Sequence, residues 1–379
     1  MKFLLICRNL RVAGGRVVGI NFIKSLKDCA PDHKFLILAP PNVGYEELEL
    51  PEGSRMMFYE GGSNPIRQWK YDTIVLPKIA QKYEPDVVFA MGNIGLVNPP
   101  CPQALLFHRP HLVYPSIHYS RETKKARFLD WFYKRRVKSC LKKTKLVFCQ
   151  TDVVKSRFNS TFNFPLDKIE IMPNAVSTFV QTETEKVDKP SVFSGSSHFN
   201  LFYLTRFYAH KNLEILLELF RNHTEELKNV RCILTINSGQ HPNASDFLNK
   251  IRFYGLEKQI LNVGPLNQDE LAGYFCHADA LLFPTLMESF SGTYLEAMHF
   301  GLPILTSDLD FAQYTCDNAA IYFDPWDPAD LAAKITLLRT NPDLSNKLIR
   351  NGKKRIEHFF ASWKMITKKT ISKLEDMVN

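Results

Sequence analysis

Two basic residues five positions apart lie in a segment that suits the binding of phosphates. Arg206 and Lys211 fall between an expected strand, Asn200–Arg206, and a helical pattern over Leu213–Phe220. A guanidinium and an ammonium at a strand-to-helix turn are able to hold both phosphates of a diphosphate beside the free amides of the helix. Solvated loop charges are the other interpretation of this segment.

A loop further along the chain carries two carboxylates, Glu288 and Glu296, on either side of an expected helix start at Thr293. The preceding strand ends near Pro284, and the small and hydroxylated residues that follow leave backbone amides open to a phosphate. Carboxylates accept hydrogen bonds from hydroxyl-rich ligands such as sugars and ribose. The pattern from Thr293 to Glu296 also fits a capping box, in which Glu296 serves its own helix. Glu288 has no visible structural duty and is the stronger candidate.

Candidate residues also follow two expected strands of the N-terminal half. Gly14 and Gly15 open a helical pattern, where paired glycines let backbone amides approach an anion, although a tight turn explains them equally well. They do not form the glycine fingerprint of dinucleotide-binding sites. His108 leaves another expected strand, where its imidazole is able to donate to a sugar hydroxyl or a phosphate. A purely structural histidine is the competing interpretation.

The elements that must position these residues are short apolar runs alternating with amphipathic stretches. Apolar runs without polar interruptions indicate strands covered on both faces, as in a parallel sheet, and the stretches Gly14–Cys29 and Ile66–Lys82 have helical spacing. Repeated strand–helix–strand units are therefore predicted. The expected strands are Lys2–Cys7, Lys34–Ala39, Arg55–Tyr59, Asp86–Met91, Gln103–His108 and Lys145–Gln150, and then Asn200–Arg206, Cys232–Ile236, Ile260–Gly264, Ala280–Pro284, Pro303–Ser307 and Ala320–Asp324.

The strand series is interrupted once. Residues 177–199 are mostly polar, with a charged stretch followed by a serine-rich one, and form the best candidate for an interdomain linker. The chain thus divides into two α/β domains, 1–176 and 200–360, each a Rossmann-like, doubly wound parallel sheet. Because such sheets bind ligands at the carboxyl ends of their strands, two of them in series are expected to face a central cleft.

One window holds the whole excess of positive charge. Residues 121–145 contain eleven Lys and Arg against two acidic residues, which accounts for the net charge of +9. Apolar residues, among them Phe128 and Trp131, recur at three- and four-residue spacings, so a basic amphipathic helix is predicted. A solvated basic face, a surface for anionic lipid headgroups and a nucleic-acid patch are the three interpretations. Aromatic residues beside lysines favour lipid over nucleic acid.

The composition excludes several classes of protein. With 379 residues, 45% hydrophobic and 12% aromatic, the chain is neither disordered nor fibrous, and no apolar run approaches the roughly 20 residues that span a bilayer. The amino terminus meets Arg8 too early for a signal peptide. Eight irregularly spaced cysteines without companion histidines indicate reduced thiols and no metal site. A cytoplasmic protein is expected, peripheral on the inner face of the cell membrane if the basic helix binds lipid.

Taken together, these segments resemble family 4 retaining glycosyltransferases of the GT-B fold. The resemblance is carried by the joint order and spacing of Arg206-x4-Lys211, the Glu288-x7-Glu296 pair, Gly301-Leu302-Pro303 and Ile171-Met172-Pro173-Asn174. It is strong over 200–325 and weaker before residue 170. It implies metal-independent transfer of a hexose, with retention at the anomeric carbon, from a nucleoside diphosphate sugar to a glycan or lipid-linked acceptor. A non-catalytic sugar-nucleotide-binding protein of the same fold is the alternative.

The resemblance also assigns roles to residues of this sequence. It implies front-face return, in which the leaving phosphate helps to deprotonate the acceptor and no residue is a firm nucleophile, and it implies that the last helix, within 361–379, crosses back onto the first domain. The implied roles are diphosphate binding for Arg206 and Lys211, donor-sugar contacts for Glu288 and His108, ribose contacts for Glu296, and phosphate-binding amides at Phe290, Ser291, Gly292, Thr293, Gly14 and Gly15.

The sequence departs from the family pattern at several positions. Thr205, Ser291 and Ala175 each stand where glycine is common, and Arg109 stands where some members carry an acidic residue. The basic helix of 121–145 lies where membrane-associated members have a lipid-facing surface, which favours a lipid-linked acceptor.

Overall fold

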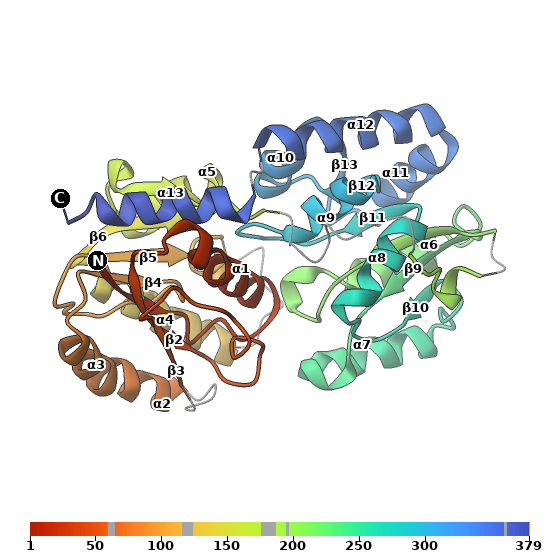
Figure 1. Ribbon diagram of the computed structural model, residues 1–379. Coiled ribbons are helices and arrows are strands. Elements are labelled where there is room, and N and C mark those ends of the chain that lie inside the picture. Colours follow the sequence, from red (N-terminus) through yellow and green to blue (C-terminus); the bar gives the residue numbers. More distant parts are fainter. Residues whose placement is uncertain (60–64, 116–123, 176–186, 195–196, 360–361, 379) are drawn as a thin grey trace. The chain divides into compact units, whose positions relative to one another are not determined.

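Two separate parallel sheets organise the chain in the computed structural model, which describes residues 1–59, 65–115, 124–175, 187–194, 197–359 and 362–378 (Figure 1). Unit 1 comprises the described residues of Met1–Tyr114, Thr123–Ala175 and Ala361–Asn379, and unit 2 those of Pro115–Glu122 and Val176–Phe360. Each unit has its own sheet and its own helices. Most of the predicted linker, 177–186 and 195–196, lies outside the described residues.

The sheet of unit 1 has seven strands among the described residues, in the order β3-β2-β1-β4-β5-β6-β7, and every neighbouring pair is parallel. Its inner strands are almost entirely buried because helices cover both faces, as continuous apolar sequence requires. The strands are β1 Lys2–Ile6, β2 Lys34–Ala39, β3 Arg55–Phe58, β4 Val87–Ala90, β5 Gln103–Phe107, β6 Thr144–Cys149 and β7 Ile169–Ile171.

The sheet of unit 2 has six strands among the described residues, in the order β10-β9-β8-β11-β12-β13, and is also parallel throughout. The predicted alternation of strands and helices is therefore confirmed in unit 2, and in unit 1 except between β2 and β3 and between β4 and β5. The strands are β8 Phe199–Tyr203, β9 Val230–Leu234, β10 Ile260–Asn262, β11 Ala280–Phe283, β12 Ile304–Ser307 and β13 Ala320–Phe323.

Helices connect all successive strands of unit 2, and those of unit 1 except β2 to β3 and β4 to β5 (Figure 1). Those of unit 1 are α1 Ala13–Cys29, α2 Pro65–Lys70, α3 Leu76–Tyr83, α4 Lys124–Leu141, α5 Asp152–Phe162 and α13 Trp363–Glu375. Those of unit 2 are α6 Glu214–Asn222, α7 Pro242–Phe253, α8 Gln268–His277, α9 Gly292–Phe300, α10 Asp310–Cys316, α11 Pro328–Thr340 and α12 Pro342–Phe359.

The single helix predicted over Ile66–Lys82 is interrupted. A π-helical turn, η1 Tyr71–Val75, separates α2 from α3. Its extra residue per turn changes which side chains face inward, and Asp72 is buried there. The apolar spacing of the sequence showed a helix but not this change of phase.

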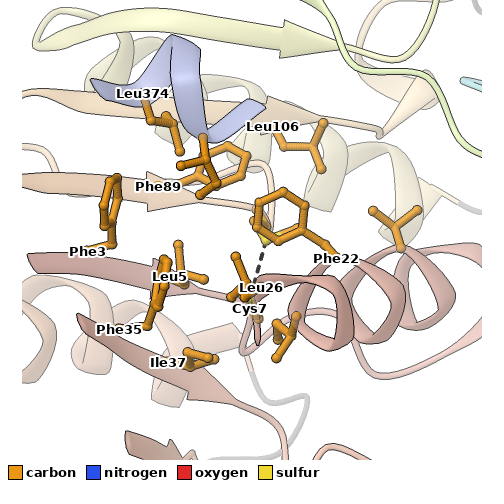
Figure 2. Packing of buried hydrophobic residues seen from close by; sticks show 14 of the residues in the cluster. Phe3, Leu5, Cys7, Phe22, Leu26, Phe35, Ile37, Phe89, Leu106 and Leu374 are labelled. Carbon is orange, nitrogen blue, oxygen red and sulfur yellow. Dashed lines mark hydrogen bonds between the residues drawn. The ribbon is translucent and has the colours of Figure 1, made fainter. Parts of the chain in front are cut away.

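The C-terminal helix α13 belongs to unit 1 although it comes last in the chain. It packs along α1 and contributes Trp363, Ile366, Ile371 and Leu374 to the main core of that unit. Figure 2 shows Leu374 among side chains of the central strands, including Phe3 and Phe89. Apolar burial on this scale is the main stabilising contribution to the unit.

Each sheet has a switch point where the chain leaves neighbouring strands in opposite directions. In unit 1 it lies between β1 and β4, and in unit 2 between β8 and β11. Loops that leave such strands at their carboxyl ends diverge and leave room for a ligand. Gly14 and Gly15 follow β1, Arg206 and Lys211 follow β8, and Glu288 follows β11, whereas His108 follows β5, the strand next to β4.

Candidate active site

The loops after β8 and β11 bring Lys211 and Glu288 together in unit 2. Lys211 Nζ forms an ion pair with Glu288 Oε1, and the two side chains are only 15% and 14% exposed. The ammonium also lies 4.8 Å from the centre of the Phe283 ring at the end of β11. The sequence predicted that both residues serve a ligand, but it did not predict that they pair with each other.

The same two loops are joined by hydrogen bonds that involve Thr285, which is completely buried. The carbonyl of His210 accepts from Leu286 N at 2.8 Å and from Thr285 Oγ1 at 3.2 Å. Thr285 Oγ1 also lies 3.3 Å from Glu288 Oε1. Sequence reasoning missed Thr285. The available signal was its position between the end of a strand and the candidate Glu288.

Arg206 is held differently from Lys211. Its side chain is exposed and forms no ion pair with any residue that the structure describes. Its backbone is fixed, because the hydroxyl of Thr205 donates to the Arg206 carbonyl at 2.9 Å while Thr205 N donates to Thr235 Oγ1 at 2.9 Å. An exposed cation on a fixed turn is suited to reach an anionic ligand.

Helix α9 begins earlier than the sequence indicated. It starts at Gly292 with Ser291 as N-cap, and no side chain caps it. Glu296 is therefore the fifth residue of the helix and not part of its first turn, and the expected capping box with Thr293 is wrong. The first turn contains no acidic residue. The amides of Gly292 and Thr293 lie at the positive end of the helix, which favours an anion.

Glu296 has an unusual titration. It is half-buried, forms no hydrogen bond with another described residue, and burial raises its pKa to about 7. Its Oε1 lies 3.9 Å from the point where a Cβ on Gly292 would stand, so the carboxyl group is directed back to the start of the helix. Near neutral pH this carboxyl group is present in both protonation states, so it is able to accept and to donate hydrogen bonds. Hydroxyl groups of a ligand also do both.

In unit 1 the structure brings Gly15 and His108 together. Gly14 and Gly15 lie in the first turn of α1, whose N-cap Val12 gives no side-chain cap. A Cβ on Gly15 would stand 3.7 Å from His108 Nε2, whereas one on Gly14 would meet nothing within 4 Å. Open amides and an imidazole therefore lie beside each other at the carboxyl edge of this sheet.

His108 is held by Asn93, a residue that sequence reasoning missed. Asn93 follows β4 with a φ of 68°, the left-handed region that asparagine tolerates, and this glycine–asparagine turn after a strand was the available signal. His108 N donates to Asn93 Oδ1 at 2.7 Å, and Asn93 Nδ2 donates to His108 Nε2 at 3.1 Å. Burial, and then the charge of Arg109, lower the pKa of His108 to about 4, so its imidazole is neutral at neutral pH.

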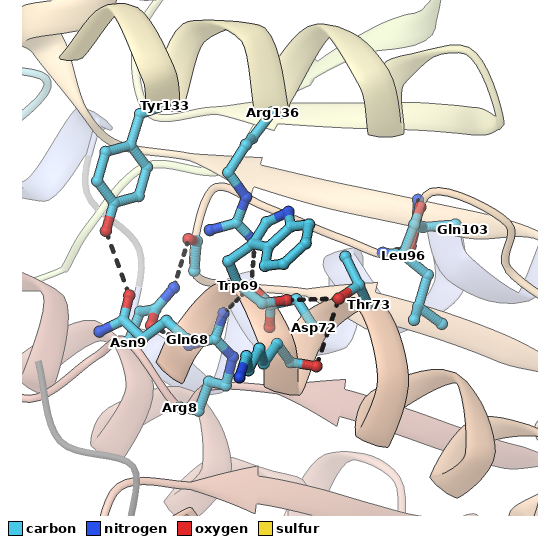
Figure 3. A network of polar contacts seen from close by, with 12 residues as sticks. Arg8, Asn9, Gln68, Trp69, Asp72, Thr73, Leu96, Gln103, Tyr133 and Arg136 are labelled. Atoms are coloured by element: carbon cyan, nitrogen blue, oxygen red, sulfur yellow. Dashed lines mark hydrogen bonds and ion pairs between the residues drawn. The ribbon is translucent and has the colours of Figure 1, made fainter. Parts of the chain in front are cut away.

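A second polar group in unit 1 is a buried network around Asp72 (Figure 3). Asp72 pairs with both Arg8 and Arg136, and the three side chains are 6%, 1% and 12% exposed respectively. The Arg8 guanidinium also lies 5.4 Å from the Tyr59 ring centre. These contacts join the end of β1 to η1 and α4. Arg109 is likewise engaged, pairing with Asp130 of α4 at 2.8 Å.

The predicted basic helix is α4, although residues 121–123 of its window lie outside the described residues. Phe128 and Trp131 are 63% and 50% exposed and stack with ring centres 5.6 Å apart. Arg135 lies 4.4 Å from the Trp131 ring. Exposed aromatic rings beside basic side chains are typical of surfaces that contact lipid headgroups.

The described residues offer neither a metal-binding cluster nor a membrane-spanning helix. They contain no cluster of three or more His, Cys, Asp or Glu that is able to hold a metal ion. None of their helices combines the length and the apolar character that crossing a membrane requires. Metal independence stays a prediction.

Comparison with solved structures defines the class of fold. Anabaena Alr3699/HepE in complex with UDP-glucose matches with a TM-score of 0.74 and 15% sequence identity, covering 99% of this chain and 100% of that one. At this identity the likeness establishes the fold alone, the GT-B type with two parallel-sheet α/β domains. The predicted fold class is confirmed in this respect, and the central cleft stays a prediction.

Sequence comparisons then point to a particular family. Residues 186–355 match the family described as Glycosyl transferases group 1. The O-antigen chain mannosyltransferase RfbU of Salmonella typhimurium is 22% identical over 240 residues, which cover 61% of this chain and 63% of that protein. The uncharacterized glycosyltransferase MJ1607 of Methanocaldococcus jannaschii is 21% identical over 228 residues, covering 58% of this chain and 57% of that protein. The chain thus spans about three fifths of the length of these relatives.

Proposed function

We propose that the chain is a retaining, metal-independent glycosyltransferase that moves a hexose from a nucleoside diphosphate sugar to a glycan or lipid-linked acceptor. The product would be a cell-surface polysaccharide or glycolipid. One observation carries the proposal: Lys211 and Glu288 pair at the switch point of unit 2, within the segment that matches the glycosyltransferase family. The similarity to RfbU, an O-antigen chain mannosyltransferase, and to HepE, whose structure contains UDP-glucose, supports the reaction class.

The Lys211–Glu288 pair supplies a way to bind the donor. A diphosphate carries more negative charge than one carboxylate, so its phosphates compete with Glu288 for the Lys211 ammonium. Arg206, which is exposed and forms no ion pair in the described part of the chain, adds a second cation. Release from Lys211 leaves the Glu288 carboxylate to accept hydrogen bonds from the sugar hydroxyls. The ion pair is therefore the ligand-free arrangement of two donor-binding groups.

The proposed transfer proceeds on one face of the sugar. The bond between the anomeric carbon and the diphosphate oxygen breaks, and its electron pair stays on that oxygen. The acceptor hydroxyl forms the new bond on the same face, and its proton passes to the departing diphosphate. Arg206 and Lys211 stabilise the charge that develops on the leaving group. Neutral His108 and the amides of Gly14 and Gly15 would contribute from unit 1.

The start of α9 is proposed to bind the nucleotide. The amides of Phe290–Thr293 would contact a phosphate at the positive end of the helix. Glu296, directed to the start of the same helix, would bind the ribose hydroxyls. A carboxyl group with a pKa of about 7 exists in both protonation states near neutral pH, so we expect donor affinity to change with pH in that range.

The exposed rings of α4 are proposed to contact an anionic membrane surface, which would bring the enzyme to a lipid-linked acceptor. The double variant Phe128→Ser with Trp131→Ser should lose most binding to vesicles that contain phosphatidylglycerol, measured by co-sedimentation. Phe253→Ser, which removes a ring that is 83% exposed in unit 2, is the matched control and should bind as before. Unchanged vesicle binding by the α4 variant would refute this part of the proposal.

The reaction itself is tested by proton NMR of sugar nucleotides incubated with the protein and excess chelator. Slow transfer to water from an α-linked donor such as UDP-glucose or GDP-mannose should first give the α-anomer of the free sugar. A β-anomer would refute retention, and activity only without chelator would refute metal independence. Nucleotide binding with no release of sugar, in the presence of acceptor extracts as well, would favour the non-catalytic alternative.

A further inference from the structure

The hydroxyl of Thr285 has more hydrogen-bond acceptors than it is able to serve. Thr285 Oγ1 lies 3.2 Å from the carbonyl oxygen of His210, 3.3 Å from that of Met287 and 3.3 Å from Glu288 Oε1. A hydroxyl donates only one hydrogen bond at a time. Its side chain is completely buried, so water does not take the place of these partners. Which acceptor receives the proton therefore depends on the charges nearby.

Two of the three acceptors are backbone carbonyls, and the third is a carboxylate. The His210 carbonyl already accepts from Leu286 N at 2.8 Å, and a backbone carbonyl is neutral. The Glu288 carboxylate is charged, and hydrogen bonds to charged groups are about twice as strong as neutral ones. While Lys211 pairs with Glu288, that charge is compensated. Once a phosphate takes Lys211, the carboxylate becomes the strongest acceptor within reach of Thr285.

We propose that Thr285 is a positioning residue for the donor sugar, whose hydroxyl holds the Glu288 carboxylate in place after Lys211 has turned to the diphosphate. The inference rests on the proposed function. It identifies the sugar portion of the donor, and not the nucleotide portion, as the part whose binding depends on Thr285. Thr285 itself does not contact the substrate. It acts through Glu288, which accepts from the sugar hydroxyls.

The test compares each sugar nucleotide with the nucleoside diphosphate that lacks the sugar. UDP with UDP-glucose and GDP with GDP-mannose are titrated by calorimetry into the wild type, Thr285→Val and Thr285→Ser. Thr285→Val keeps the shape of the side chain without its hydroxyl, and Thr285→Ser keeps the hydroxyl. Thr315→Val is the matched control, because Thr315 is also buried in unit 2 and its hydroxyl donates to Phe311 O at 2.8 Å within α10.

We expect Thr285→Val to weaken binding of the sugar nucleotide about tenfold, while affinity for the nucleoside diphosphate changes by less than about twofold. Thr285→Ser and Thr315→Val should bind both ligands as the wild type does. In a Glu288→Ala background the effect of Thr285→Val should disappear, since the residue through which it acts is absent. Thr285→Ala replaces Thr285→Val in the series if the valine variant does not fold.

The outcomes separate the two claims. If Thr285→Val loses the same affinity for both ligands, Thr285 is a structural residue. If it loses affinity for neither, Thr285 has no role in binding. Both results overturn the inference and leave the proposed function intact. If the wild type binds none of these four nucleotides and none of the diphosphates and sugar nucleotides of adenosine, thymidine and cytidine, the proposed function fails and this inference fails with it. A loss that persists in the Glu288→Ala background would also overturn the inference.

Discussion

The two switch points hold their polar side chains in opposite ways. In unit 1, Asp72 lies between Arg8 and Arg136 in a network that is almost completely buried. In unit 2, Lys211 and Glu288 are about 85% buried but pair one to one, with the exposed Arg206 in the same loop as Lys211. The first arrangement fixes three elements to one another. The second consists of groups that a ligand with phosphates is able to separate.

This difference indicates where stability and binding reside. If the carboxylate between two guanidinium groups moves away, two positive charges stay buried without a counter-charge, in surroundings that solvate ions poorly. A single ion pair between flexible side chains exchanges one partner for a ligand at much lower cost. We therefore expect substitutions in unit 1's network to act on folding, and substitutions in unit 2's pair to act on ligand binding.

The largest effect on folding is expected from Asp72→Ala. Removing the shared carboxylate leaves Arg8 and Arg136 buried without a counter-charge, which should lower the free energy of unfolding by about 3–5 kcal/mol. Urea denaturation measures this change. Nucleotide affinity, measured on the folded variant, should stay close to the wild-type value. A loss below about 1 kcal/mol would mean that water reaches this network.

The next effect is expected from Lys211→Ala, which should lower sugar transfer about a hundredfold to a thousandfold because the leaving diphosphate loses a cation. Glu288→Ala should reduce transfer comparably while retaining affinity for the nucleoside diphosphate. Initial rates at saturating donor measure both. Lys334→Ala is the matched control, because Lys334 pairs with Asp330 on the surface of α11. Near-normal transfer by Lys211→Ala would place the diphosphate elsewhere.

Glu296→Gln should separate stability from binding within unit 2. Between about pH 4.5 and 7 the Glu296 carboxyl is protonated in the folded state but ionised in the unfolded state, because its pKa is raised by folding. The free energy of unfolding therefore falls as the pH rises through this window. Glutamine does not ionise. The variant should therefore match the wild type near pH 5 and be more stable at pH 8 by about 1–3 kcal/mol. Thermal unfolding at both pH values measures this, and an equal difference at both would contradict the burial of the carboxyl group.

Despite greater stability at pH 8, Glu296→Gln should bind nucleotides more weakly, because the carboxylate proposed to accept from the ribose is lost. A variant that is both more stable and tighter in binding would remove Glu296 from the site.

The smallest effect is expected at the surface of unit 1. Lys27 and Glu49 pair there with side chains that are 56% and 77% exposed. Glu49→Ala should leave the urea midpoint of unfolding almost unchanged, because an exposed ion pair contributes little to stability. Comparison of Glu49→Ala with Asp72→Ala in the same urea denaturation experiment shows how much of the Asp72→Ala effect comes from burial. Equal losses in the two variants would contradict the comparison of the two regions.

The sequence allowed parts of this arrangement to be predicted because some signals are local. Parallel strands were visible as continuous apolar runs, and Arg206, Lys211 and Glu288 follow strand ends directly. The network of Arg8, Asp72 and Arg136 was not visible, because each neighbour in it is 64 residues away along the chain. No pattern along the chain indicates which charges meet across a fold.

Other misses have equally specific causes. The sequence placed the start of α9 too late, because Thr293 and Glu296 have the spacing of a capping box. In the structure the N-cap is Ser291, two residues before Thr293. Thr285 and Asn93 escaped notice because they act on other side chains, Glu288 and His108, and carry no charge of their own. Residues of this kind become evident only when the distances between side chains are known.

The central claim is that a diphosphate takes Lys211 from Glu288, and the most direct measurement is thermal unfolding with UDP, GDP, ADP, TDP and CDP in the presence of chelator. One nucleotide at about a hundred times its dissociation constant should stabilise the wild type by about 2.7 kcal/mol, and Lys211→Ala should lose most of that increase. Stabilisation of Lys211→Ala equal to that of the wild type, or no stabilisation of the wild type by any of the five, would contradict the claim.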